Sequence, residues 1–183
     1  MNMSTADSSR REFTLRVALA VVGGAALAMP ARLRAAAQPV QHAADIQHDA
    51  EAIHQVVKFS AAPARVYAAL IDPVEFSAVT KLSMVPQAPP AQIAREAGGE
   101  FVLFGGHIAG RHIELAPGRR VVQAWRAADW DAGHYSIVRF ELAATKEGTT
   151  LTFDHTGFPK GQAAHLADGW YANYWNPIRK HLA

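Results

Sequence analysis

The sequence predicts an α+β fold in which a curved antiparallel sheet wraps around a long C-terminal helix. Residues 162–182 place apolar side chains four apart, at Leu166, Trp170, Tyr174, Ile178 and Leu182. This spacing is typical of an amphipathic helix. Five runs rich in β-branched and aromatic residues precede it, separated by short turns that contain glycine or proline. Because such turns join antiparallel neighbours, these runs predict one sheet whose apolar face packs on the helix.

The five predicted strands cover residues 100–104, 107–115, 120–127, 134–144 and 149–156. If the last turn pairs Ala144 with Thr149, Phe140 lies opposite Phe153 on the inward face. The same register places Val138 opposite His155, with His134 and Ser136 on the inward face as well. Asp154 then points outward. The shared apolar parity predicts a well-specified register.

The elements before these strands are a strand at 53–60 and two short helices. The first helix begins at Pro63, and the second begins at Asp72-Pro73 and continues to about Val79. Residues 84–97 contain three prolines and little periodicity, which predicts a loop.

The C-terminal helix has one irregular position. Ala163, Ala167 and Tyr171 are expected to widen its apolar stripe. Pro177 lacks a backbone N–H, so we expect a kink near residues 173–176.

The N-terminus resembles an export signal of the twin-arginine type. Arg10 and Arg11 precede an apolar run of 13 residues, 17–29, and the small residues Ala35 to Ala37 follow. The run is shorter than the roughly 20 residues that a membrane-spanning helix needs. The expected organisation is a signal peptide at 1–37, a polar linker at 38–52 and one domain at 53–183. The mature protein is then periplasmic or secreted, with no stable membrane span.

Charge and cysteine content exclude several classes of function. Residues 1–37 hold five of the 18 Lys and Arg and two of the 16 Asp and Glu, so the remainder has a net charge of −1. This leaves no electrostatic case for binding nucleic acid. The absence of cysteine excludes disulfides, iron–sulfur clusters and thiol chemistry.

Several spaced motifs carry a family resemblance over roughly residues 55–182. They are Gly98 to Phe101, Phe104 to Gly110, Glu114 to Pro117, Val121 to Arg126, Gly133-His134, Thr150 to Thr152, Gly157 to Pro159 and Gly169-Trp170. Together they resemble the C-terminal domain of the activator of the ninety-kilodalton heat-shock chaperone ATPase. The resemblance implies a helix-grip fold of the START-like (SRPBCC) superfamily, whose members commonly enclose an apolar cavity between sheet and last helix.

No catalytic or metal-binding arrangement is predicted, and no cofactor is expected. The nine histidines include no H-E-x-x-H pair. A triad of Ser136, His155 and Asp154 would need Asp154 on the inward face, against the strand alternation. A proton-transfer role for His155 or His134 stays open. The paired glycines are not followed by a helix, so they predict turns rather than a phosphate loop.

The sequence therefore favours binding of a hydrophobic small molecule in a cavity between the sheet and the C-terminal helix. The candidate ligand-binding residues are Phe101, Trp125, His134, Ser136, Val138, Phe140, Phe153, His155, Trp170 and Tyr174. The expected partners are this molecule and, for the precursor, the export machinery. One alternative is a co-chaperone-like module with a protein partner. A second alternative is a cyclase- or hydrolase-type enzyme of the same superfamily.

Overall fold

The computed structural model describes residues 51–183. The predicted signal peptide, and all but the last two residues of the predicted linker, lie outside the described residues. The elements are β1 (Ala52–Phe59), α1 (Pro63–Ile71), α2 (Pro73–Thr80), β2 (Gln92–Ile93), β3 (Glu100–Leu103), the 3₁₀ turn η1 (Phe104–Gly106), β4 (Ile108–Ala116), β5 (Arg120–Ala127), β6 (Ser136–Thr145), β7 (Gly148–Thr156), α3 (Ala163–Trp170), the π-helical segment η2 (Tyr171–Trp175) and α4 (Asn176–Leu182). The predicted order of elements is confirmed.

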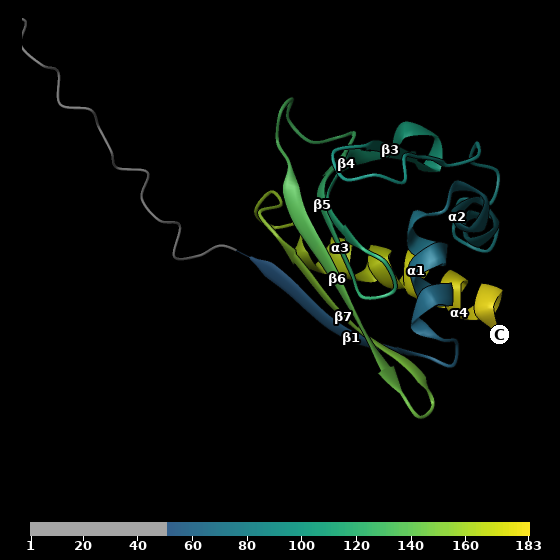
Figure 1. The fold of residues 1–183 in the computed structure, drawn as a ribbon. Helices are drawn as coiled ribbons and strands as arrows, with labels where there is room; N and C mark the ends of the chain where they lie inside the picture. Colours follow the sequence, from purple (N-terminus) through teal and green to yellow (C-terminus); the bar gives the residue numbers. More distant parts are fainter. Residues whose placement is uncertain (1–50) are drawn as a thin grey trace, which may run out of the picture. The chain divides into compact units, whose positions relative to one another are not determined.

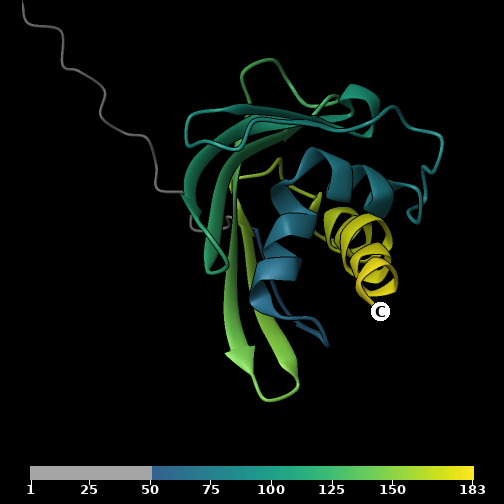
Figure 2. The same cartoon turned by 45° about the vertical axis from the view of Figure 1, so that its right-hand side comes forward.

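The strands form one antiparallel sheet in the order β1-β7-β6-β5-β4-β3-β2. Figures 1 and 2 show the sheet curving around the helices, which all lie on its inner side. The predicted α+β helix-grip architecture is therefore confirmed. The short strand β2 was not predicted, because it lies within the proline-rich stretch and pairs with β3 through only two residues.

The register of the last hairpin is the predicted one. Ala144 pairs with Thr149, Phe140 with Phe153 and Val138 with His155. Buried and exposed residues alternate along both strands. The hydrophobic parity is thus enough to fix this register.

The pairing of β4 with β5 is irregular at one position. A β-bulge between His112 and Glu114 interrupts the β4–β5 ladder, and bulges increase the local twist of a sheet. Gly110 lies beside this bulge. A Cβ atom at that position would come within 2.4 Å of the Phe101 ring and 2.1 Å of the Ala124 carbonyl oxygen. Only glycine therefore lets Phe101 cross over β4.

The C-terminal helical stretch is continuous but changes its winding. The predicted irregularity lies at residues 171–175, where the backbone N–H of Asn176 donates to the carbonyl of Tyr171. This is the i→i+5 pattern of a π-helix. The wider turn buries both Tyr174 and Trp175. The expectation that Tyr171 widens the apolar stripe is wrong, since Tyr171 is 40% exposed.

Ion pairs run across the outer face of the sheet. Asp154 lies there, as strand parity predicts, with an oxygen 2.7 Å from His54 Nδ1 and another 2.8 Å from Arg139. The hydrogen bond from His54 and the contacts with Arg139 lower the pKa of Asp154. Arg139 and Arg120 share Glu141 at 3.8 Å. Exposed pairs of this kind contribute little to stability individually.

The substitution Phe140→Ala tests the assignment of Phe140 to the buried face of β6. Phe140 is 2% exposed and its ring lies 5.2 Å from that of Phe153. Truncating a buried aromatic side chain should lower the free energy of unfolding by about 3–5 kcal/mol, measured in urea. The matched control is Ile137→Ala on the outer face of the same strand, which should cost no more than about 0.5 kcal/mol. Equal losses in the two variants would contradict the assignment of faces.

Candidate ligand-binding site

The molecule has a pocket of about 310 Å³ beneath the first half of the C-terminal helical stretch. Its lining comes from the loop after α2, from η1 and the start of β4, from the end of β5 and the loop after it, and from α3 and η2. The lining residues are Met84, Val85, Phe104, His107, Ile108, Trp125, Ala127, Asp129, Trp130, Gln162, His165, Leu166, Gly169, Trp170, Asn173 and Tyr174. The volume lies at the lower end of the roughly 300–1,000 Å³ that is usual for small-molecule sites.

Helical spacing places one row of side chains over this pocket. Leu166, Gly169, Trp170, Asn173 and Tyr174 recur three and four residues apart, so they share one helix face. Gly169 contributes the hollow, because a Cβ atom built there meets no heavy atom within 4 Å. The pocket thus depends on a missing side chain in the middle of an aromatic face.

Aromatic rings form the inner wall. The ring of Trp170 lies 4.2 Å from Tyr174 and 5.7 Å from Trp125, which in turn lies 5.3 Å from Trp130. Phe104 closes the far side, with its ring 5.5 Å from Tyr174. Phe104 has a φ of 51°, a left-handed conformation that is unusual for a bulky residue. Strained backbone of this kind is often found at functional sites.

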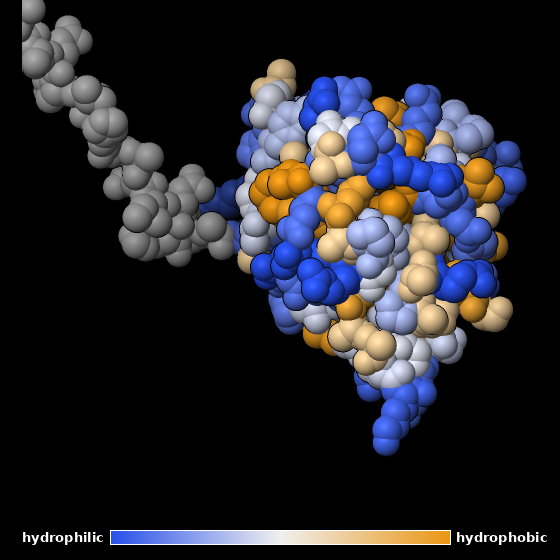
Figure 3. All heavy atoms as spheres, viewed as in Figure 1, coloured by the Kyte–Doolittle hydropathy of each residue, from blue (hydrophilic) through white to orange (hydrophobic). Residues whose placement is uncertain are grey.

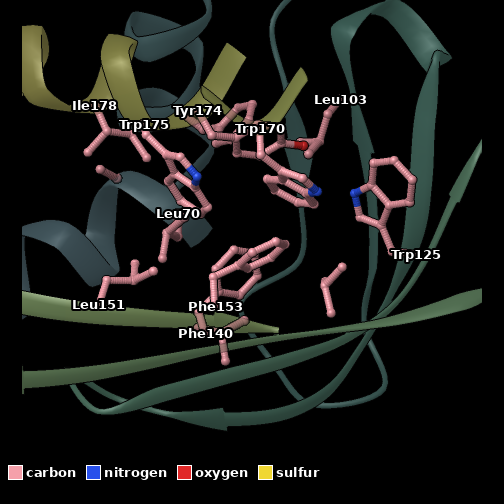
Figure 4. Close-up of a cluster of buried hydrophobic side chains, with 14 of the residues drawn as sticks. Leu70, Leu103, Trp125, Phe140, Leu151, Phe153, Trp170, Tyr174, Trp175 and Ile178 are labelled. Carbon is pink, nitrogen blue, oxygen red and sulfur yellow. The ribbon is translucent and has the colours of Figure 1, made fainter. Parts of the chain in front are cut away.

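The middle of the helix–sheet interface is filled by side chains. Phe153 packs against Trp170 at 4.4 Å and against Trp175 at 5.2 Å. Figure 4 shows Phe140 and Phe153 on the sheet, facing the two tryptophans of the helix. Side chains thus fill the middle of the interface, where the cavity was predicted, and the pocket lies beside it, toward β4 and β5.

The ten residues predicted for the site separate into three groups. Trp125, Trp170 and Tyr174 line the pocket. Six others are buried in the core away from it: Phe101, Ser136, Val138, Phe140, Phe153 and His155. His134 precedes β6 instead of lying within it, and its Nε2 donates to the carbonyl of Gly157 at 3.0 Å. The predicted inward position of His134 on the strand is therefore not observed.

His155 is part of a hydrogen-bonded chain inside the core. The indole N–H of Trp170 donates to Nδ1 of His155 at 3.1 Å, so Nε2 carries the proton and donates to Ser136 at 2.7 Å. The hydroxyl of Ser136 then donates to the carbonyl of Trp125 at 2.9 Å. Burial lowers the pKa of His155 to about 3. The imidazole is thus neutral and held within the fold, with neither ring nitrogen left to bind a ligand.

Two polar atoms at the pocket wall have no well-formed hydrogen bond among the described residues: the indole nitrogen of Trp125 and the hydroxyl oxygen of Tyr174. Trp125 is 3% exposed and Tyr174 is 5% exposed. Burial raises the pKa of Tyr174, and its contact with Trp125 offsets part of that rise. Tyr174 therefore keeps its proton at neutral pH.

Sequence reasoning missed much of the lining, including Phe104, Trp130 and Gly169. Trp130 lies between the predicted strand 120–127 and the following turn, where a large aromatic side chain would have to find a buried position. Gly169 had a usable signal as well, because glycine inside a helix lowers stability and needs a packing reason.

The described residues contain no group of three or more His, Asp or Glu side chains placed to hold a metal ion. Within the same part of the chain, no helix is long and apolar enough to cross a lipid bilayer.

Comparison with known proteins places this architecture in a family. Residues 60–183 match the family model of the Activator of Hsp90 ATPase homolog 1-like proteins, and this match covers most of the chain. The chain belongs to this family. The resemblance carried by the spaced sequence motifs is thereby confirmed, and the AHSA1-like domain is a member of the START-like superfamily.

Curated relatives match this AHSA1-like chain over part of their length. The activator of 90 kDa heat shock protein ATPase homolog 2 of Mus musculus is 29% identical over 90 residues, which cover 49% of this chain and 27% of the mouse protein. The activator of Dictyostelium discoideum is 34% identical over 85 residues, covering 46% of this chain and 22% of that protein. The matched stretch is about a quarter of these relatives.

Solved structures share the fold of the AHSA1-like domain. An HSP90 activator from Plasmodium falciparum superposes with a TM-score of 0.64 at 24% identity, covering 70% of this chain and 94% of that one. The Aha1 dimer from Colwellia psychrerythraea gives 0.59 at 16% identity, covering 72% and 96%.

The neutral state of His155 predicts an acid-sensitive fold. Its folded-state pKa of about 3 lies below the ordinary value of 6.5, so the unfolded chain binds the proton first as the pH falls. Neutral His155 contributes its full stabilisation above pH 6.5, and this contribution is lost progressively as the pH falls toward 3. The free energy of unfolding then decreases by up to about 1.4 kcal/mol per pH unit. Urea unfolding between pH 7 and 4.5 measures this loss.

His155→Gln is the control for that titration, because glutamine keeps a donor and an acceptor but does not ionise. The slope of stability against pH below 6.5 should be shallower in the variant. Parallel curves for the two proteins would show that His155 titrates normally in the fold.

Proposed function

We propose that this AHSA1-like domain binds a small apolar molecule in the pocket beneath α3 and η2. The observation that carries the proposal is the aromatic wall of Trp125, Trp130, Trp170 and Tyr174 around the hollow left by Gly169. A concave and mainly apolar site with a few polar groups is the usual form of a small-molecule pocket. The filled core beside the pocket supports this end of the helix–sheet interface as the proposed ligand site.

The loop after α2 provides an entrance. Met84 and Val85 line the pocket yet are 74% and 44% exposed. The backbone N–H of Met84 donates to the side chain of Asn173 at 3.3 Å. This long hydrogen bond costs little to break, so Met84 and Val85 can move aside while the helix and the sheet stay in place.

Binding of another protein is the second candidate function. Curated relatives are described as activators of a 90 kDa heat-shock protein ATPase. In this chain, α2 and the following loop expose Val74, Leu82, Met84 and Val85. Figure 3 shows that hydrophobic residues also reach the surface between hydrophilic ones on the side seen in Figure 1. Exposed apolar patches commonly mark interaction surfaces.

We also propose that the protein is exported to the periplasm or beyond. Arg10 and Arg11 before a weakly apolar run support this localisation. An exported domain has no contact with a cytosolic chaperone, which favours the small molecule over the protein partner.

Filling the pocket tests the binding proposal. Gly169→Leu places a side chain in the open space, so saturable binding of the uncharged fluorophore N-phenyl-1-naphthylamine should weaken at least about tenfold. The free energy of unfolding should stay the same or rise, since glycine inside a helix is unfavourable by about 0.5–1 kcal/mol.

Ala164→Leu adds the same side chain at an exposed position of α3 and should bind the fluorophore like the parent. Unchanged affinity in Gly169→Leu, or an absence of saturable binding by the parent, would contradict a pocket function and favour the surface role.

Export is tested by replacing Arg10 and Arg11 together with lysine. The precursor should then accumulate in the cytoplasm, because the pair of arginines is the recognised feature of this signal type. Cell fractionation with immunoblotting measures the distribution. An unchanged periplasmic yield would refute the assignment.

A further inference from the structure

The mouth of the pocket carries a negative charge and no positive one. Among the described residues that line the pocket, none is Lys or Arg, and Asp129 is the acidic side chain. The other ionisable side chains of the lining are His107, His165 and Tyr174. With histidine counted as neutral at pH 7 and Tyr174 in its protonated form, the carboxylate of Asp129 is the charge that a bound molecule would meet.

Asp129 is accessible from the pocket and fixed in place by its loop. Its residue is exposed, and its side chain makes no hydrogen bond or ion pair with the other described residues. The loop is held on both sides of Asp129. The backbone N–H of Ala128 donates to the carbonyl of His107 at 2.8 Å, and that of Trp130 donates to the carbonyl of Ala127 at 3.2 Å. The carboxylate therefore stays at the rim of the pocket.

The basic side chain of the same segment is engaged away from the mouth. Arg126 follows Trp125 on β5, so strand alternation turns it toward the opposite face of the sheet. Its Nη2 donates to the carbonyl of Trp130 at 3.0 Å, and its guanidinium lies 5.8 Å from the centre of the Tyr135 ring. Arg126 is not part of the lining. Its charge therefore does not replace the missing cation at the mouth.

The aromatic walls favour the same sign of charge on a ligand. The ring of Trp130, the residue after Asp129, lies 5.3 Å from that of Trp125, which lies 5.7 Å from Trp170 (Figure 4). The faces of such rings attract cations, and tryptophan attracts them most strongly. An anion at the mouth would meet a carboxylate and electron-rich rings without a basic side chain. Both features thus select against an anion.

Resting on the pocket function proposed above, we infer that the ligand is a lipophilic amine, with an apolar body and one positively charged amine or ammonium group. The apolar body fills the hollow at Gly169, and the charged group stays at the mouth beside Asp129 and Trp130. A cation at the mouth keeps part of its hydration, which avoids the large cost of burying a charge. Asp129 thereby selects among molecules that share the same apolar body.

Three compounds with one apolar body and head groups of similar shape test this inference. They are (2-naphthylmethyl)trimethylammonium, its uncharged isostere 2-neopentylnaphthalene, and the anion 2-naphthylmethanesulfonate. Because the three differ in hydration, the quantity compared is the change in each dissociation constant caused by Asp129→Asn. Tryptophan quenching and calorimetry measure it at about pH 8, where histidine is ordinarily uncharged, and at about 0.15 M salt.

Asp129→Asn should weaken binding of the cation by about two- to fivefold, as expected for a partly exposed charge pair, and should strengthen binding of the anion. Affinity for the neutral isostere should stay the same. The effect on the cation should shrink in about 1 M salt, where charges are screened within about 3 Å. The melting temperature should match that of the parent, since the Asp129 side chain has no partner among the described residues.

The matched control is Asp131→Asn, which removes the same charge from an exposed position of the same loop outside the lining. It should change the three affinities by less than about 1.5-fold. If Asp131→Asn reproduced the full effect on the cation, net charge and not contact with Asp129 would be the cause, and the inference would fail.

The remaining outcomes distinguish this inference from the proposed function. Saturable binding in which Asp129→Asn leaves the cation unaffected would overturn the selection by charge while leaving the pocket function intact. The same conclusion would follow if the parent bound the anion more tightly than the cation. If none of the three compounds bound to the parent, and N-phenyl-1-naphthylamine did not bind either, both proposals would be wrong.

Discussion

The contact between Trp170 and Phe153 is the point on which the rest of this domain depends. At 4.4 Å it is the closest ring contact between the helix and the sheet, and Trp175, Phe140 and His155 all pack around the same pair. Trp170 also donates to His155, which connects the helix to Ser136 and to the backbone of β5. Packing and hydrogen bonding therefore fix the same residue, so the helix has one position on the sheet.

The π-helical segment allows two large aromatic residues to be buried on one side of the helix. In this wider turn the N–H of Asn176 donates to the carbonyl of Tyr171, and both Tyr174 and Trp175 are turned inward. Trp175 then donates to Gln55 on β1 at 2.6 Å, while Tyr174 faces the other end of the sheet. A regular α-helix would separate adjacent residues by about 100° and leave one of them partly exposed.

Sequence reasoning succeeded where one periodic pattern determined the outcome. Strand parity alone fixed the register of Phe140 with Phe153, because any slip of one residue would turn the apolar side chains outward. The pocket could not be placed in the same way. Strand alternation predicts that Val138 and His155 point inward. It does not predict which part of the interior is already filled by Trp170 and Trp175. The pocket depends on Gly169, Phe104 and Trp130, which belong to three separate segments whose meeting is a property of the tertiary fold.

These contacts explain why the helix–sheet interface is filled around Phe153 but hollow around Gly169. Around Phe153 every polar group of the His155 chain has a partner, so that region gains nothing from a ligand. Around Gly169 the missing side chain leaves space, and the pocket there is lined by Trp125, Trp170 and Tyr174. Close packing elsewhere makes the fold stable enough to tolerate this defect. An unfilled hollow lowers the stability of the free protein, and an apolar ligand that fills the space would recover that stability.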